Sequence, residues 1–347
     1  MLETRMIEQL FLSTVQGRKS RATPVWMMRQ AGRYLAEYRK IRATQNDFIS
    51  FCLNPKQASI VSLQPIKRYG FDAAIIFSDI LIIPWALNRN VRFKTGIGPV
   101  LDAMEQPDSI DASCLNGLNQ KLAPVGEAIN LTRKALPSET TLIGFAGAPW
   151  TLITYMAEGG TSRDFPKARR WGWQNRQALD GLLDILINAT ISFLSLQARS
   201  GAQTLMLFDS WASAVPAAQR DWLVIKPARA VVEGVRKNGH NQPIIGFPKG
   251  IGEGLIRYAA ESGVDAIGLD YGVDPVWAGQ NLPAKMPVQG NLDPISLLNA
   301  GKEMFRDIDH ILDAFHDRPH IFNLGHGITP KTPVENVQKM INHIRNR

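Results

Sequence analysis

The sequence predicts an α/β fold: a single (β/α)₈ barrel of the TIM type that spans residues 1–347 as one domain, with an N-terminal helical extension. Two observations predict it. Eight short apolar segments of β-forming residues recur along the chain, and most are separated by longer stretches with helical periodicity. Strands that alternate with helices pair in parallel, and eight units are more typical of a closed barrel than of an open doubly wound sheet.

The N-terminal segment carries Leu2, Met6 and Leu10 on one face of a short helix. It lacks the basic-then-apolar order of a signal peptide. The longest uninterrupted apolar run, Ile80–Leu87, has eight residues, whereas a membrane span needs about 20. We therefore expect no association with a membrane.

The predicted strands and helices follow one another in the order expected of a barrel. The strands are Pro24–Met28, Ala73–Phe77, Leu142–Ala146, Thr204–Phe208, Ile244–Phe247, Ala266–Leu269, Pro287–Gln289 and His320–Leu324. The main helices are Pro55–Tyr69, Trp173–Gln197, Ala217–Lys237, Leu255–Ser262 and Val334–Arg345. The segment Asn88–Leu136, with a turn signal at Gly96–Pro99, is predicted to be an insertion between two successive barrel strands.

The composition is that of a folded chain, because 45% of the residues are hydrophobic and 20% are charged. These values exclude a disordered or fibrous polypeptide. The 39 Lys and Arg residues exceed the 31 Asp and Glu residues, which gives a net charge of +8 and is compatible with an anionic ligand. The two cysteines, Cys52 and Cys114, are too few for a disulfide framework, so we expect a cytoplasmic protein.

Polar groups follow several of the predicted strands at the point where the apolar run ends. They are Arg29, Asp79, Asp209, Ser210, Lys249, Asp270 and His326. The carboxyl ends of barrel strands meet at one mouth, where barrel enzymes place their chemistry. The sequence therefore predicts an active site built from these strand ends.

The densest basic region, Arg18–Arg42, delivers Arg29 to this mouth. Arg29 and Arg33 are four residues apart, so in a helical turn they share one face. Two guanidinium groups on one face suit a carboxylate or phosphate ligand. A solvated basic helix face explains the same residues, and charge alone does not separate these two interpretations.

Asp79 lies between two apolar runs, Ala73–Phe77 and Ile80–Ile83, which would desolvate its carboxylate. A buried carboxylate requires a donor, such as Arg29 or an N–H group of a ligand, because an unpaired buried charge is costly. The same position suits a helix cap or an ion pair. Both a structural and a catalytic role therefore stay open at this point.

We find no motif for a cofactor or a metal. The glycine run Gly246–Gly254 matches neither the phosphate-binding loop nor the dinucleotide fingerprint, and we interpret it as a strand-to-helix turn. His316 and His320 are four residues apart, but Pro319 breaks any helix that would align them as metal ligands.

Two long motifs resemble the signatures of the uroporphyrinogen decarboxylase family. The first is Pro24–Leu35, PVWMMRQAGRYL, and the second is Gly144–Leu152, GFAGAPWTL, in which Pro149 opens a helix that carries Tyr155. The resemblance continues through four shorter motifs and covers essentially the whole chain. These motifs are Phe77–Leu81, Phe208–Trp211, Gln289–Pro294 and Asn323–Gly327.

The resemblance implies a (β/α)₈ barrel enzyme, a carboxy-lyase of porphyrin and heme biosynthesis. Such an enzyme decarboxylates the four acetate side chains of uroporphyrinogen III to methyl groups and yields coproporphyrinogen III. The resemblance further implies a homodimer that uses no cofactor and no metal. The expected partner is a small polycarboxylate substrate, with neither nucleic acid nor a membrane.

The resemblance also assigns roles to the site residues. Arg29 and Arg33 would hold substrate carboxylates, with the backbone of Gln30, Ala31 and Gly32 as the floor between them. The predicted catalytic residues are Asp79, which would accept the pyrrole N–H groups and stabilise positive charge on the ring, and Arg29, a candidate proton donor by position. Further substrate contacts are assigned to Tyr155, Ser210, His326 and Phe208, the last through a backbone group or its ring face.

Two alternatives belong to other functional classes. Zinc-dependent corrinoid methyltransferases share the barrel fold, but they need a His/Cys ligand set that the sequence around Cys52 and Cys114 does not provide. A basic module that binds nucleic acid would interleave basic and aromatic residues along an exposed face. The predicted mouth instead places Arg29 beside the carboxylate of Asp79.

Overall fold

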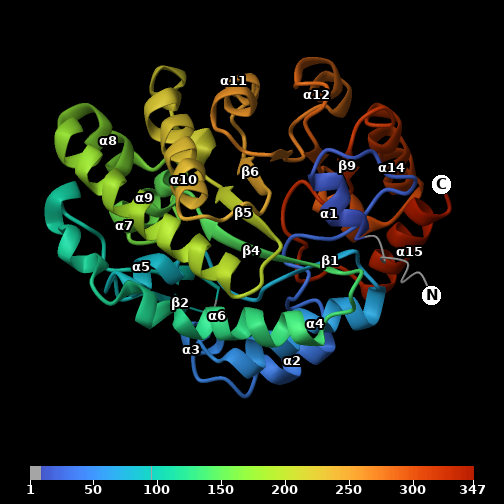
Figure 1. The fold of residues 1–347 in the computed structure, drawn as a ribbon, viewed down its shortest axis with the longest axis horizontal. Coiled ribbons are helices and arrows are strands. Elements are labelled where there is room, and N and C mark those ends of the chain that lie inside the picture. The colour runs from blue at the N-terminus through green and yellow to red at the C-terminus, as the bar shows by residue number, and fades with distance from the viewer. Residues whose placement is uncertain (1–8, 95) are drawn as a thin grey trace.

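The computed structural model describes residues 9–94 and 96–347, and its centre is a parallel sheet whose neighbouring strands follow one another in the chain (Figure 1). The sheet order is β1-β4-β5-β6-β7-β8-β9. Its strands are β1 (Ala73–Ile75), β4 (Thr141–Gly147), β5 (Thr204–Asp209), β6 (Ile244–Pro248), β7 (Ala266–Gly268), β8 (Val288–Gln289) and β9 (His320–Ile321). Seven of the eight predicted strands are thus confirmed, several with shorter bounds.

The eighth position of the barrel is filled by the segment around Val25. Val25 forms an isolated parallel bridge with Phe322, whose N–H donates to the carbonyl of Pro24 at 2.8 Å. On the other side, the N–H of Asp72 donates to the carbonyl of Val25 at 3.0 Å. The segment therefore joins the two edges of the curled sheet, and the predicted closed barrel is confirmed.

The predicted strand Pro24–Met28 is nevertheless reduced to this single bridge. The N–H of Met28 donates to the side chain of Asn323 at 3.0 Å instead of to a strand, and Arg29 then turns the chain with a φ of 61°. A hydrogen bond to a side chain and a turn therefore take the place of the strand pairing that the apolar pattern predicts.

Helices surround the sheet (Figure 1). The longer ones are α4 (Pro55–Tyr69), α6 (Leu118–Ala135), α7 (Pro149–Glu158), α8 (Pro166–Gln174), α9 (Arg176–Arg199), α10 (Lys226–Lys237), α11 (Gly254–Glu261), α14 (Lys302–Ala314) and α15 (Val334–Arg345). The shorter ones are α1 (Leu10–Val15), α2 (Ala36–Arg42), α3 (Phe48–Cys52), α5 (Ile82–Ala86), α12 (Pro275–Asn281) and α13 (Pro294–Asn299).

The predicted helices at Pro55–Tyr69 and Val334–Arg345 are confirmed at both ends, and the helix near Leu255 is α11. The long helix predicted from Trp173 is wrong as one element, since α8 ends before Asn175 and α9 begins after it. The side chain of Asn175 accepts from the N–H of Ala178 at 3.4 Å and starts a new helix. The region predicted as one helix from Ala217 contains a 3₁₀ turn and a π turn before α10 begins.

The predicted insertion is shorter than Asn88–Leu136. It contains the antiparallel hairpin of β2 (Arg92–Lys94) and β3 (Gly98–Val100) and two 3₁₀ turns, whereas its last part is the barrel helix α6. The hairpin packs against the end of α7, because the N–H of Leu101 donates to the carbonyl of Gly159 at 2.9 Å.

Helix α9 is the one helix of the described residues that is long and apolar enough to cross a membrane. Polar residues interrupt its apolar positions, so the longest uninterrupted apolar run of the sequence lies elsewhere, at Ile80–Leu87. Its most apolar window is 56% buried inside the fold. Because α9 lies against α6, α10 and β4, its apolar side chains contribute to the core between sheet and helices.

The amino ends of the strands are closed by α1, the confirmed part of the predicted N-terminal extension. Phe11 of α1 packs edge-on against Trp26, with ring centroids 6.3 Å apart. The indole N–H of Trp26 donates to the side chain of Gln289 at 2.8 Å inside the barrel. Leu2 and Met6, which define the rest of the predicted helix face, lie outside the described residues.

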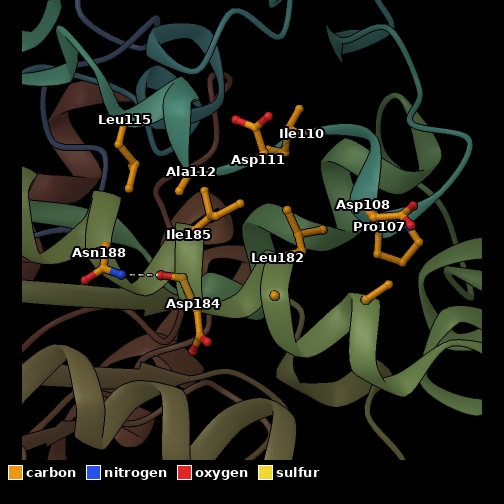
Figure 2. A pocket seen from close by; sticks show the side chains of 12 residues that line it. Pro107, Asp108, Ile110, Asp111, Ala112, Leu115, Leu182, Asp184, Ile185 and Asn188 are labelled. Carbon is orange, nitrogen blue, oxygen red and sulfur yellow. Dashed lines mark hydrogen bonds between the residues drawn. The ribbon is translucent and has the colours of Figure 1, made fainter.

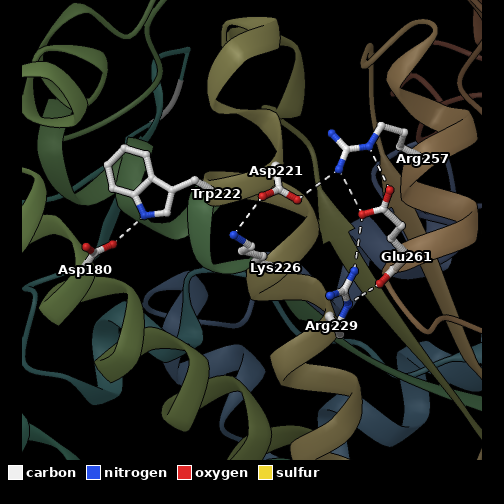
Figure 3. A network of polar contacts seen from close by, with 7 residues as sticks. All are labelled: Asp180, Asp221, Trp222, Lys226, Arg229, Arg257 and Glu261. Carbon is white, nitrogen blue, oxygen red and sulfur yellow. Dashed lines mark hydrogen bonds and ion pairs between the residues drawn. The ribbon is translucent and has the colours of Figure 1, made fainter.

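A network of ion pairs covers the outer surface between α10, the π turn that precedes it, and α11 (Figure 3). Asp221 pairs with Lys226 at 3.0 Å and with Arg257 at 3.3 Å. Glu261 pairs with Arg257 at 2.9 Å and with Arg229 at 3.5 Å. The cations of this outer network are therefore all neutralised by neighbouring carboxylates.

Candidate active site at the barrel mouth

The barrel topology brings the predicted site residues to one end of the sheet. Each follows the carboxyl end of a different segment: Arg29 the Val25 segment, Asp79 strand β1, Tyr155 strand β4 through α7, Ser210 strand β5, and His326 strand β9. Parallel strands place these ends at one mouth. The predicted grouping of these residues is thus compatible with the observed topology.

The turn that carries Arg29 is held by the chain that follows β9. The N–H of Ile328 donates to the carbonyl of Met28 at 3.1 Å. The side chain of Arg29 lies directly over Gly327, where any Cβ atom would collide with it. A glycine at 327 is therefore needed for the arginine to lie across this strand end.

The expected helical turn carrying Arg29 and Arg33 on one face is wrong. Residue 29 has a left-handed φ of 61°, and the first helix of this region, α2, begins only at Ala36. Both arginine side chains are exposed and form no ion pair with the carboxylates of residues 9–94 and 96–347. They remain available to an anion, but through a turn and not through a helix face.

Gln30 is fully buried and ties this turn to the barrel. Its side chain accepts from the N–H of Met27 at 3.2 Å and donates to the carbonyl of Ala73 at 3.1 Å. Its own carbonyl accepts from the hydroxyl of Tyr34, and its own N–H donates to Met27. Both backbone groups of Gln30 are therefore occupied, so the expected backbone floor is limited to Ala31 and Gly32.

Asp79 is half-buried just beyond β1. One carboxylate oxygen, Oδ1, accepts from the N–H of Leu81 at 2.9 Å, which caps the turn into α5. Burial raises the pKa of Asp79 to about 6, while the Leu81 N–H and the charge of Arg29 act in the opposite direction. Arg29 influences Asp79 through its charge and donates no hydrogen bond to it. Asp79 therefore does cap the turn into α5, as one of the two interpretations predicted, and its second oxygen, Oδ2, is left for a ligand.

His326 and Tyr155 share the same electrostatic environment. Burial and then the charges of Arg29 and Lys249 lower the pKa of His326 to about 4, so its imidazole is neutral at neutral pH. Burial raises the pKa of Tyr155, and the charge of Asp79 adds to this effect. The charge of Arg29 therefore acts on Asp79, Tyr155 and His326, and the charge of Lys249 acts on His326.

Phe208 can offer only part of what was expected. Its carbonyl already accepts from the N–H of Ala148 at 2.8 Å, so this group is not free for a ligand. Its half-buried ring stands edge-to-face against Phe145, at 5.5 Å, and Phe247, at 5.9 Å. Ser210, two residues on, is half-buried.

Comparison with known proteins decides the family. The sequence model of uroporphyrinogen decarboxylase (URO-D) matches residues 6–347. The chain belongs to the uroporphyrinogen decarboxylase family. It is 48% identical to a uroporphyrinogen decarboxylase of Maricaulis maris, over 97% of both chains. It is 46% identical to one of Granulibacter bethesdensis, over 96% of this chain and 98% of that one. The expected family, carboxy-lyase class and role in porphyrin and heme biosynthesis are confirmed.

A methyltransferase from Methanosarcina mazei shares the barrel, with a TM-score of 0.81, 16% identity and 98% of each chain covered. This similarity concerns the fold alone. The corrinoid methyltransferase alternative is not favoured, because the relatives at 43–48% identity are named uroporphyrinogen decarboxylase. Within residues 9–94 and 96–347, no three His, Cys, Asp or Glu side chains are grouped as metal ligands.

Two residues near the predicted site, Lys249 and Trp211, were given no role from the sequence. Lys249 is predicted at a strand end but given no role, and its Nζ lies 5.7 Å from the ring centroid of Trp211. The N–H of Trp211 donates to the hydroxyl of Thr151, which in turn donates to buried Asp209 at 2.6 Å. The only sequence signal for either was a polar or aromatic residue just beyond an apolar strand.

Two surface recesses lie away from the predicted site residues of this uroporphyrinogen decarboxylase fold. One, of about 360 Å³, lies between the 3₁₀ turns of the insertion and α9 (Figure 2). The other, of about 430 Å³, lies at the amino ends of the strands, beside Gly17 and Lys285. None of the predicted site residues lines either recess.

Proposed function

We propose that the barrel mouth binds uroporphyrinogen III and removes carbon dioxide from its four acetate side chains, giving coproporphyrinogen III without a cofactor or a metal. The observation that carries this proposal is the state of Asp79. It is a half-buried carboxylate that accepts a hydrogen bond only from the backbone N–H of Leu81, and the charge that acts on it is that of Arg29.

Substrate capture rests on the basic turn. Uroporphyrinogen carries eight carboxylates, and Arg29 and Arg33 present exposed guanidinium groups that bind carboxylates in a bidentate manner. The N–H groups of Ala31 and Gly32 lie between them in the chain and donate to no backbone acceptor in the described residues. Together these groups form an anion-binding turn at the rim.

Asp79 stabilises the reacting ring. Its free oxygen accepts pyrrole N–H groups, which orients the macrocycle in the mouth. When a pyrrole carbon is protonated, the ring becomes cationic, and the carboxylate lies where that charge develops. A preorganised charge in a partly desolvated site is an effective form of transition-state stabilisation.

The reaction then balances without a redox partner. Protonation of the ring carbon next to the one that bears the acetate arm places positive charge on the acetate-bearing carbon and so creates an electron sink. The carbon–carboxylate bond breaks, its electron pair neutralises the ring cation, and carbon dioxide leaves. The exocyclic methylene carbon takes up a proton to become methyl, and the ring carbon loses the proton it gained. Arg29 is the positional candidate for the proton donor, although a guanidinium is a weak acid.

The remaining residues complete the contacts. The hydroxyl of Tyr155 and the neutral imidazole of His326 provide hydrogen bonds to substrate carboxylates, and Ser210 provides a further hydroxyl. The ring face of Phe208 packs against a pyrrole. These roles follow from the family resemblance and are compatible with the positions of the residues.

The test is anaerobic incubation of purified, chelator-treated protein with chemically reduced uroporphyrinogen III, followed by chromatography of the oxidised products. We expect porphyrins with seven, six, five and four carboxylates to appear without added cofactor. Recovery of only the eight-carboxylate species from folded protein would contradict the proposal, and bound zinc in stoichiometric amount would favour the methyltransferase alternative.

We further propose that the chain is one domain, forms a homodimer and works in the cytoplasm, without nucleic acid or a membrane as a partner. The family supports the dimer, and the burial of α9 in the core supports a protein that leaves no membrane span exposed. Sedimentation at micromolar concentration measures the oligomeric state. A gel shift with heterologous DNA at moderate salt tests the basic-module alternative.

A further inference from the structure

Lys249 occupies a distinctive place in the ring of strand ends. Starting from the Val25 segment and following the sheet order, β6 is the fifth of eight positions. Lys249, at the end of β6, therefore lies across the mouth from Arg29. Its backbone is fixed there, because its N–H donates to the carbonyl of Asp209 at 3.1 Å and its carbonyl accepts from Ser213 at 3.1 Å.

The side chain of Lys249 is half-buried and lies over an anchored aromatic ring. That ring, Trp211, packs against Phe165 at 4.7 Å and against Tyr155 at 6.3 Å. An ammonium above an indole ring is stabilised by the ring quadrupole and is held in place by it. The charge of Lys249 is thus held over Trp211, whose ring also packs against Tyr155, one of the proposed substrate contacts.

No carboxylate in residues 9–94 and 96–347 forms an ion pair with this ammonium. A half-buried cation without a counterion is costly unless a ligand supplies one. Its charge also reaches His326, on the Arg29 side of the mouth. The mouth therefore carries cations on opposite rims, with Asp79 on the β1 strand end next to Arg29.

We infer that Lys249 binds a substrate carboxylate remote from the pyrrole that reacts at Asp79. This inference rests on the proposed function and deepens it. A macrocycle with carboxylates around its whole rim can contact Arg29 on one side and Lys249 on the other. The second contact fixes which acetate arm lies at Asp79. Because the remote contact is the same before and during the reaction, it contributes to binding and not to the chemical step.

The test compares Lys249→Met, which keeps the apolar stem, with Lys249→Arg, which keeps the charge. We expect Lys249→Met to raise KM for uroporphyrinogen by about tenfold or more, while kcat changes by less than about twofold. Lys249→Arg should restore most of the binding. Lys339→Met is the matched control, since it removes an equal charge from the exposed face of α15 and should leave KM unchanged.

A second readout needs no turnover. Binding of the unreactive octacarboxylate uroporphyrin, followed by fluorescence quenching, should weaken in Lys249→Met by the same factor as KM. An unchanged KM and unchanged uroporphyrin binding in a folded Lys249→Met variant would overturn the inference, and so would a fall in kcat at constant KM. If the wild-type protein binds uroporphyrin but does not decarboxylate uroporphyrinogen, the proposed function fails while the binding role of Lys249 is still measured.

Discussion

The barrel mouth and the outer network between α10 and α11 use the same residue types in opposite ways. In the outer network, Arg257 and Arg229 each meet a carboxylate, and Asp221 and Glu261 each meet two cations (Figure 3). At the mouth, Arg29, Arg33 and Lys249 form no ion pair with any carboxylate of the described residues. The comparison shows that the cations at the mouth have no counterions from the described residues, which fits the proposed binding of an anionic substrate there.

The energetic value of the charges differs as well. Arg257 is 57% exposed and Asp221 is 35% exposed, so water screens the attraction between their charges. At the mouth, burial is strong enough to move the pKa of Asp79 to about 6 and that of His326 to about 4. A charge there acts on a bound molecule with little screening.

The largest expected effect comes from Asp79→Asn, which keeps the shape and removes the charge. We expect decarboxylation to fall by at least about 100-fold, because the ring cation loses its counter-charge. Initial rates from product chromatography measure the loss, and circular dichroism checks the fold. Asp221→Asn makes the same chemical change in the outer network and should leave the rate unaltered. Equal rates in wild type and Asp79→Asn would remove Asp79 from its central role.

The next effect concerns the guanidinium groups. Arg29→Met should lower kcat/KM by about 10- to 100-fold through the loss of a charge-assisted hydrogen bond to substrate. Gly327→Ala should act in the same direction without touching the arginine, because a methyl group at 327 occupies the place of the Arg29 side chain. Arg257→Met is the control on the outer surface. A Gly327→Ala variant with wild-type kinetics would show that Arg29 does not need its observed position.

The pH dependence is a smaller and reversible effect. Burial raises the pKa of Asp79 to about 6, so its anionic form predominates at pH 7 and is lost as the pH falls through 6. We expect kcat/KM to be level above about pH 7 and to decrease tenfold per pH unit well below 6. Steady-state rates in buffers of constant ionic strength measure this profile. A level profile from pH 5 to 7 would mean that protonation of Asp79 does not limit the reaction.

A separate pair of effects concerns stability and not turnover. Burial lowers the pKa of His320 to about 4, and its Nε2 lies 2.8 Å from the carbonyl of Gly290. As the pH falls, the unfolded chain therefore binds a proton at His320 before the folded protein does. The free energy of unfolding is thus unaffected by His320 above about pH 6.5 and decreases as the pH falls toward 4. Burial raises the pKa of Asp209 to about 7, so its effect has the opposite sign: stability is lost as the pH rises from about 4 to 7.

The two groups thus oppose each other in one pH window. As the pH falls toward 4, the wild type loses up to about 3 kcal/mol of stability through His320, and His320→Gln should abolish this loss. As the pH rises from about 4 to 7, the wild type loses a similar amount through Asp209, and Asp209→Asn should abolish that loss. Urea unfolding at pH 4.5, 5.5, 6.5 and 7.5 measures both slopes. If the slopes of the two variants match that of the wild type, the buried side chains do not titrate as the structure indicates.

Much of the fold could be predicted from local patterns. The apolar strands are separated by helices of clear period, and α4 ends at Gly70, whose left-handed φ of 62° suits a glycine cap. What could not be predicted is set by long-range contacts. The Val25 segment is a strand by composition, yet its pairing is decided by Phe322 and Asn323. The left-handed φ of Arg29 has no sequence signal, since glycine is the residue that favours it.

In the candidate site, too, local patterns predict part of the arrangement and long-range contacts decide the rest. The motifs predict which residues face the mouth, because polar groups just beyond strands are visible in the sequence. They do not show that the backbone of Gln30 is occupied or that the carbonyl of Phe208 is taken by Ala148. They also leave Lys249 without a role, because the opposite position of β6 and the Val25 segment exists only once the barrel has closed.

The closure between residues 25 and 322 also sets the order in which the site forms during synthesis. The turn that carries Arg29 emerges early from the ribosome, but Phe322, Asn323 and Gly327, which hold it, are made near the end of the chain. Domains fold from the N-terminus as they are made, yet here the turn that carries Arg29 has to wait for the last strand. A nascent or truncated chain without residues 320–347 therefore carries the arginines but no assembled mouth.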